Sequence, residues 1–210
     1  MYRMPDFTEP DQKNVLEFMH AHPFVTLIGN DGNHSAATQV PVLIEEREGT
    51  LSLRGHLMKK TDHHTALLNN PEVLVLFMGP QCYVSSSWYS ERGTGGTWNY
   101  ITVHVRGRLR FFEEEETITQ LQDLTRRFEK HQRYPELVEN MPPEYVNTLV
   151  KAIAGFEITV QSVEPIFKLS QNKEDDTYEK IVNELNSLND YSANEIADEM
   201  VKRRPHLFSS

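Results

Sequence analysis

Residues 50–107 most constrain what this chain can fold into. Two apolar runs in this stretch, Leu51–Leu57 and Val73–Met78, are rich in Val, Leu and Phe and are bounded by turn formers. Short apolar runs of this kind indicate buried strands. Trp98–Phe112 alternates between apolar and polar residues, which predicts a long strand with a bend or bulge at Gly107.

The flanking sequence adds more strands and several helices. We expect further strands at Phe24–Ile28, Ser35–Ile44, Gln81–Ser86 and Phe156–Val163, with Pro41 favouring a sheet edge. We expect helices at about residues 8–22, 61–69, 113–130 and 142–155, from their capping residues, prolines and apolar spacing. Strands at hairpin spacing with peripheral helices predict a mainly β (α+β) fold built on a small barrel.

The composition changes near residue 172. We expect residues 1–171 to form the barrel domain and 172–210 a charged linker with a helical tail. The predicted tail helices are Tyr178–Leu188 and Ala193–Arg203, and a capping box at Ser192–Glu195 opens the second. Because the tail has few large apolar residues, we expect it to pack on the surface or on a partner.

Charge and composition exclude several classes of protein. The chain has 210 residues, a formal net charge of −10 and one cysteine, Cys82, so an internal disulfide is impossible. Direct binding to nucleic acid is not expected from this charge and from the lack of a long basic stripe. Residues 1–14 are polar, unlike a signal peptide, and no apolar run approaches the ~20 residues of a membrane span. We therefore expect a cytoplasmic protein.

The polar residues between the strands suggest a ligand. Lys59 and Lys60 lie at a strand end before a short helix, a setting that suits a phosphate. The Ser-, Trp- and Tyr-rich run that follows suits a flat ring. FMN combines both features, although composition alone does not single it out. His56, His63 and His64 lack the carboxylate pair or HExxH spacing of a zinc site, so we predict no metal.

Five motifs in order resemble one family. They are Gly55-His56-Leu57-Met58-Lys59-Lys60, Leu68–Leu74, Tyr83–Tyr89, Thr97-Trp98-Asn99-Tyr100 and the pair Gly155–Ile158 with Lys168–Asn172. Over about residues 1–185 the chain is similar to the PaiB family of FMN-binding negative regulators. That family is a branch of the FMN-binding split β-barrels, which include pyridoxamine-phosphate oxidases. The resemblance implies a homodimer with FMN at the subunit interface.

The resemblance also implies site residues. The strand Ala37–Val42, with Thr38, Gln39 and Val40, would run beneath the flavin, and Lys59 would bind the phosphate with His56 nearby. Many relatives have Arg at the Lys59 position, and Asp62-His63-His64 replaces a more usual Pro-Gln-Trp-like triplet. Further cofactor-binding candidates are Ser85, Trp88, Trp98, Asn99, Lys168 and Gln171. Trp88 and Trp98 equally suit the core or the dimer interface, and Lys168 to Asn172 either covers the ligand or ends the barrel.

Three functions remain open from the sequence. The first is an FMN-binding regulator that acts through partners or on transcription. The second is an FMN-dependent oxidoreductase, in which the flavin supplies the redox chemistry and no side chain stands out as a general base. The third is a haem-binding split-barrel protein, which the histidines keep open.

Overall fold

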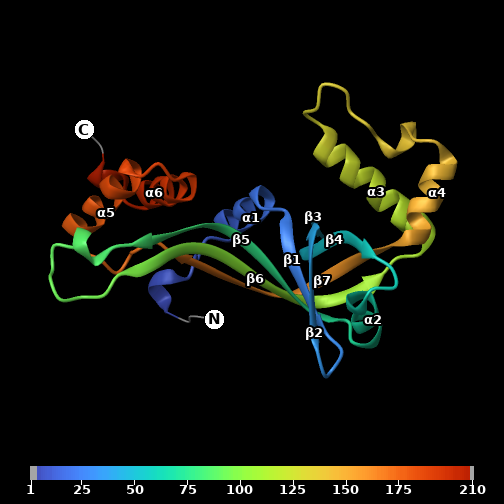
Figure 1. The fold of residues 1–210 in the computed structure, drawn as a ribbon, viewed down its shortest axis with the longest axis horizontal. Helices are drawn as coiled ribbons and strands as arrows, with labels where there is room; N and C mark the ends of the chain where they lie inside the picture. The colour runs from blue at the N-terminus through green and yellow to red at the C-terminus, as the bar shows by residue number, and fades with distance from the viewer. Residues whose placement is uncertain (1–3, 209–210) are drawn as a thin grey trace. The chain divides into compact units, whose positions relative to one another are not determined.

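Seven strands form one sheet whose two edge positions are occupied by strands that are close in the chain. The strand order is β2-β1-β5-β6-β7-β4-β3 (Figure 1). The strands are β1 (Phe24–Asn30), β2 (Ser35–Pro41), β3 (Leu43–Arg47), β4 (Thr50–Met58), β5 (Glu72–Val84), β6 (Thr97–Phe111) and β7 (Ile153–Lys168). The structure is a computed structural model that describes residues 4–208. Residues 1–3 and 209–210, which the predictions for the two ends of the chain include, lie outside the described residues.

Within residues 4–208, six α-helices and four short 3₁₀ turns accompany the sheet. The helices are α1 (Gln12–Ala21), α2 (Asp62–Asn69), α3 (Glu114–Glu129), α4 (Pro143–Ala152), α5 (Asp175–Ser187) and α6 (Tyr191–Arg203). The 3₁₀ turns are η1 (Pro5–Phe7), η2 (Ser86–Trp88), η3 (Val138–Asn140) and η4 (Pro205–Leu207). The helices predicted from capping residues and apolar spacing are confirmed, each within a few residues.

The chain divides into two compact units, which we describe separately. Unit 1 comprises Met1–Phe18, Met78–Val103 and Glu164–Ser210, and unit 2 comprises Met19–Phe77 and His104–Val163. Strands β5, β6 and β7 contribute residues to both units.

In unit 2 the sheet curls back on itself between β2 and β4. A Cβ atom on Gly55 of β4 would lie 3.0 Å from the carbonyl oxygen of Pro41 at the end of β2. One residue, Val42, separates β2 from β3, and its N–H donates to the Pro23 carbonyl at 2.9 Å. The prediction of a single strand over Ser35–Ile44 is therefore wrong. Pro41, which lacks an N–H, ends the edge strand, and the chain then crosses to the opposite end of the sheet.

The core of unit 2 has two parts. Fully buried side chains of the sheet, Leu27, Leu53, Phe156 and Ile158 among them, fill the barrel. A smaller apolar cluster joins α3, η3 and α4 to the start of β7 and consists of Leu121, Val138, Val146, Val150 and Ile153.

The two strands predicted at Val73–Met78 and Gln81–Ser86 are one continuous strand, β5. Gly79 and Pro80, which separate the two predicted strands, lie inside it. Strand β1 pairs with β5 only at Leu74–Leu76, so the missing N–H of Pro80 costs no bond on that side. At Gly79 a Cβ atom would lie 2.5 Å from Phe18 Cε2, so this glycine makes room for a packed ring.

The helix predicted over residues 142–155 includes Gly155, which instead lies inside β7. Helix α4 ends at Ala152 and β7 begins at Ile153. A Cβ atom on Gly155 would lie 2.7 Å from Thr117 Oγ1 on α3. The glycine therefore permits close contact between a helix and a strand, a role that sequence position alone does not reveal.

The C-terminal helices bury their apolar residues within unit 1. In Figure 1, α5 and α6 lie against each other. Tyr178, Ile181 and Leu185 of α5 and Ile196 and Met200 of α6 are fully buried. The Tyr178 hydroxyl donates to the Met200 carbonyl at 2.9 Å. The apolar residues are few, but nearly all of them face inward.

The cap of α6 also differs from its prediction. Asp190 accepts a hydrogen bond from the Ala193 N–H at 2.8 Å and is the N-cap residue. The Ser192 hydroxyl instead pairs with Gln81 of β5, donating to its carbonyl at 2.8 Å and accepting from its N–H at 2.7 Å. Ser192 therefore joins the helix to the sheet.

The predicted fold class, mainly β with peripheral helices, is confirmed. Within residues 4–208, no helix combines the length and apolar character needed to cross a membrane.

The buried tail makes a stability prediction. Leu185→Ala removes a fully buried side chain from unit 1, so we expect the free energy of unfolding to fall by about 2–5 kcal/mol in urea titrations. Leu188→Ala, at a position that is 39% exposed, is the control and should cost no more than about 0.5 kcal/mol. Equal effects of the two substitutions would contradict a packed tail.

Candidate functional site

Lys59 is held in place at both its backbone and its side chain. It follows β4, and its N–H donates to the Ala152 carbonyl at 2.9 Å. Its Nζ donates to the Val150 carbonyl at 3.0 Å, so the residue satisfies two carbonyls at the C-terminal end of α4. An ammonium has three N–H donors, so two remain for a ligand. The side chain is half-buried.

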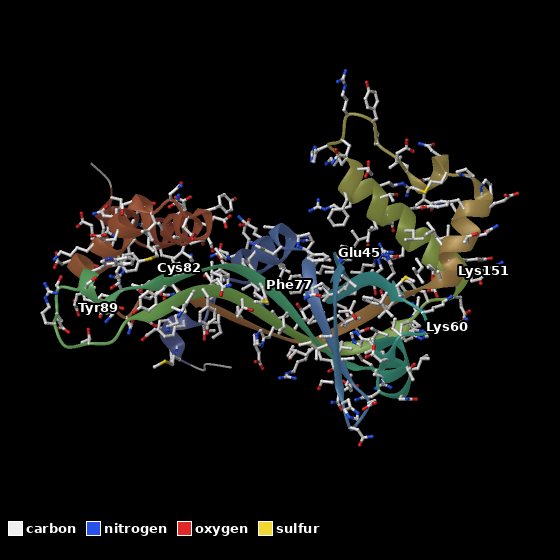
Figure 2. The ribbon with its side chains drawn as sticks, viewed as in Figure 1. Glu45, Lys60, Phe77, Cys82, Tyr89 and Lys151 are labelled. Atoms are coloured by element: carbon white, nitrogen blue, oxygen red, sulfur yellow. The ribbon has the colours of Figure 1, made fainter. Side chains whose placement is uncertain are left out.

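Lys60 differs from Lys59 in conformation and exposure. It is exposed and has a φ of 64°, the left-handed region, at the turn between β4 and α2 (Figure 2). The sharp turn separates the two adjacent lysines, as expected if only one of them serves a ligand.

The N-terminus of α2 is largely satisfied by its own side chains. The Thr61 hydroxyl accepts from the His64 N–H at 3.1 Å, and Asp62 Oδ1 accepts from the His63 N–H at 2.7 Å. The carboxylate of Asp62 also places a negative charge in the first turn. A phosphate near the N-terminus of α2 would therefore be attracted mainly by the charge of Lys59. The free helix N–H groups predicted from the sequence would contribute less.

Strand β2 is an edge strand with two different faces. Gln39 is exposed, Val40 is buried and Thr38 is half-buried. One side of the strand pairs with β1 over Phe24–Asn30. The other side lies at the end of the strand order, so its backbone groups are available to a ligand.

Three histidines near Lys59 in the sequence have lowered pKa values. Burial lowers the pKa of His56, His63 and His64, and the charge of Lys59 lowers that of His64 further. The Thr38 hydroxyl and His63 Nδ1 are 2.7 Å apart, whereas His56 Nδ1 and His63 Nε2 are buried without a hydrogen-bond partner. Among residues 4–208, no group of three or more His, Cys, Asp or Glu side chains is arranged to hold a metal.

In unit 1, the motifs around Asn99 and Lys168 meet. Lys168 Nζ donates to Thr97 Oγ1 at 2.5 Å, and burial lowers the pKa of Lys168. The Ser170 hydroxyl donates to Asn99 Oδ1 at 3.1 Å, and Asn99 Nδ2 lies 3.6 Å from Met200 Sδ. Asn99 is fully buried. Gln171 bonds locally, accepting from the Leu169 N–H at 2.7 Å and donating to the Phe167 carbonyl.

The remaining predicted residues of unit 1 lie around η2 and the start of β6. The Ser85 hydroxyl accepts from the Ser87 N–H at 3.2 Å and caps η2, which leaves Trp88 half-buried. Trp98 is 54% exposed and meets Tyr83 edge-on, with ring centroids 6.0 Å apart. These two aromatic rings form an apolar surface on β5 and β6.

The predicted site residues thus form two groups. Thr38, Gln39, Val40, His56 and Lys59 belong to unit 2, and Ser85, Trp88, Trp98, Asn99, Lys168 and Gln171 belong to unit 1. Their roles in binding a cofactor stay predictions.

Sequence reasoning missed a buried ion cluster in unit 2. Arg54 of β4 donates to Glu45 of β3 and to Asp123 of α3, the latter at 2.9 Å. Glu45 and Asp123 also line a cleft of about 260 Å³ with His20, Pro23, Val42, Leu43, Ile44 and Arg127. The available signal was an arginine inside the apolar run Leu51–Leu57, but its partner Asp123 is 69 residues away.

Comparison with known proteins identifies the family. The model of the family described as "Putative FMN-binding domain" matches residues 1–162. The chain belongs to this family. It is also 28% identical over 200 residues to the "Protease synthase and sporulation protein PAI 2" of Bacillus subtilis (strain 168), covering 95% of this chain and 96% of that protein. The family predicted from the five motifs is confirmed.

Two solved structures share the fold at low sequence identity. The flavocytochrome Anf3 from Azotobacter vinelandii aligns with a TM-score of 0.60 and 14% identity, covering 80% of this chain and 72% of that one. The FAD and heme binding protein from Mycobacterium smegmatis aligns with a TM-score of 0.54 and 13% identity, covering 77% and 73%. These likenesses support the split-barrel fold alone.

The Arg54 cluster makes a second stability prediction. Arg54→Met removes a cation whose side chain is only 10% exposed and leaves two carboxylates without it, so unfolding should require roughly 1.5–3 kcal/mol less. Arg126→Met is the matched control, because Arg126 also pairs with Asp123 but is 54% exposed and should contribute at most about 1 kcal/mol. Urea unfolding of both variants tests this, and a larger loss for Arg126→Met would refute the assignment.

Proposed function

We propose that this chain is a cytoplasmic FMN-binding regulator that works as a homodimer with flavin held between the subunits. The family match over residues 1–162 carries the proposal, because it includes both β2 and the Lys59 turn. The relationship to PAI 2 along 95% of the chain supports the regulatory part. Given the net charge of −10, regulation would pass through a protein partner or a metabolite and not through direct DNA contact.

The residues of unit 2 fit a flavin phosphate. Lys59 is anchored to the end of α4 and keeps two N–H donors, which a phosphate would accept. The unpaired edge of β2 offers backbone N–H and C=O groups to the polar edge of an isoalloxazine ring. Bound FMN would supply the redox chemistry, and the protein would orient it and exclude water.

Haem is the second candidate, because two proteins of similar fold are a flavocytochrome and an FAD and heme binding protein. An axial ligand to haem iron requires an accessible histidine nitrogen. Here the free nitrogens of His56 and His63 are buried, so either ring would have to move. The matched family is described as FMN-binding, and we therefore favour FMN.

Absorption spectroscopy and light scattering test the proposed function directly. We expect flavin bands in the purified or FMN-reconstituted protein, and a mass twice the 24.4 kDa of the chain. A haem spectrum would refute the choice of cofactor, and a monomer with full flavin occupancy would refute the interface site. Bleaching of the flavin by reduced nicotinamide would favour the oxidoreductase over the regulator.

Substitution of Lys59 tests the phosphate contact. Losing a hydrogen bond to a charged group costs roughly 1.5–3 kcal/mol, so Lys59→Ala should weaken FMN binding about 10- to 150-fold in a fluorescence titration. Riboflavin, which has no phosphate, should bind the variant and the parent almost equally.

Lys60→Asn is the control for this variant. It removes the neighbouring charge, and asparagine tolerates the left-handed φ of 64° at that position. We expect its FMN affinity to stay close to that of the parent. Parent-like FMN affinity in Lys59→Ala would remove Lys59 from the site.

A further inference from the structure

His63 joins the helix after Lys59 to the edge strand β2. The ring lies on α2 and is 2% exposed. Its Nδ1 is 2.7 Å from the Thr38 hydroxyl, across 25 positions of sequence. The contact therefore connects two segments that the proposed function assigns to different parts of FMN: the phosphate near Lys59 and the ring along β2.

The side chain of His63 packs closely against β1 because residue 29 is a glycine. A Cβ atom on Gly29 of β1 would lie 3.1 Å from His63 Nε2 and 2.7 Å from Leu67 Cδ2. Only a residue without a side chain lets α2 approach β1 this closely. The ring is thus enclosed by β1, β2 and its own helix.

Protonation of the His63 ring is unfavourable in this environment. His63 Nε2 is buried without a hydrogen-bond partner, so a protonated ring would place a charged N–H against Gly29 and Leu67. Asp62 on the same helix is the charged group that acts on His63 and favours protonation, but burial outweighs it and lowers the pKa. The contacting residues of β1 and β2, Gly29 and Thr38, carry no charge.

We propose that His63 is a proton-sensitive lock between α2 and β2, so that acidification releases β2 and weakens FMN binding. The effect on FMN rests on the proposed function, whereas the lock itself does not.

The direction of the effect follows from which state takes up the proton. In the locked state the pKa of His63 lies below its ordinary value of 6.5, and in the released state it returns toward 6.5. Above about pH 6.5 both states are neutral and the lock has its full stability. As the pH falls below that value, only the released state binds a proton. The lock then weakens until the pH passes below the pKa of the locked state.

FMN titrations between about pH 7.5 and 5.5 test the proposal with His63→Asn. Asparagine keeps an amide near the position of Nδ1 to bond Thr38 but does not titrate. The FMN phosphate itself takes up a proton at about pH 6, so all variants should lose some affinity on acidification. Below about pH 6.5 we expect the parent to lose up to about tenfold per pH unit more than His63→Asn does. His64→Asn, the neighbouring control, should retain the decline of the parent. His20 and His56 remain in every variant, so their titration cancels in the comparison.

Hydrogen exchange of β2 amides in the FMN-free protein provides a readout independent of the cofactor. After correction for intrinsic rates, acidification should increase opening of residues 35–41 in the parent and in His64→Asn, but not in His63→Asn. Identical acid responses of parent and His63→Asn in exchange would overturn the lock. If FMN fails to bind at any pH, the proposed function fails, while the exchange result still decides the lock.

Discussion

Closure of the sheet at Gly55 is the constraint on which unit 2 depends. A side chain at this position would meet Pro41 on one side and Phe156, 2.8 Å away, on the other, so β2 can lie over β4 only because residue 55 has none. The contact brings β2 near the turn that follows β4. Thr38 of β2 and His63 of α2 are 2.7 Å apart in this arrangement, although nothing in their local sequences predicts the contact. The candidate site is thus a consequence of barrel closure.

Unit 2 contains most of the buried polar side-chain atoms that have no hydrogen-bond partner. Among the described residues, side-chain atoms that are buried without a hydrogen-bond partner occur on Arg54, His56, His63, Tyr89 and Gln120, and all except Tyr89 belong to unit 2. Glu45 Oε2 is also buried, but it lies 2.7 Å from Arg47 Nη2. Each group without a partner costs about 1–3 kcal/mol unless water or a ligand satisfies it. Three of them lie on β4 or on the helix that follows it. Natural sequences keep such costs mainly at functional positions, which agrees with a site at this end of β4.

Local patterns predicted the elements whose signals are local. Strand β1, helix α2 with its Thr61 cap, and the long strand β6 follow from periodicity and turn residues, and the family follows from motif order. The predictions are wrong where a residue far away in the sequence packs against the position in question. Gly79 and Gly155 look like breakers, but each makes room for a side chain, of Phe18 and Thr117 respectively, from another element. The charge of Lys59 made it a candidate phosphate ligand in the sequence. Its hydrogen bond to the Val150 carbonyl spans 91 positions, and no sequence pattern predicts it.

The segment matched by the family model does not correspond to either of the two compact units. The family match ends at residue 162, yet unit 1 contains residues from both sides of that point. Phe18 packs on Phe167 with ring centroids 5.5 Å apart, Glu9 pairs with Arg203 at 2.6 Å, and Gln81 bonds Ser192 through both backbone groups. The matched segments of unit 1 therefore lack a closed core without residues 164–203. The alignment with PAI 2 covers 95% of this chain, so the similarity extends beyond residue 171 into the helices that complete the core of unit 1.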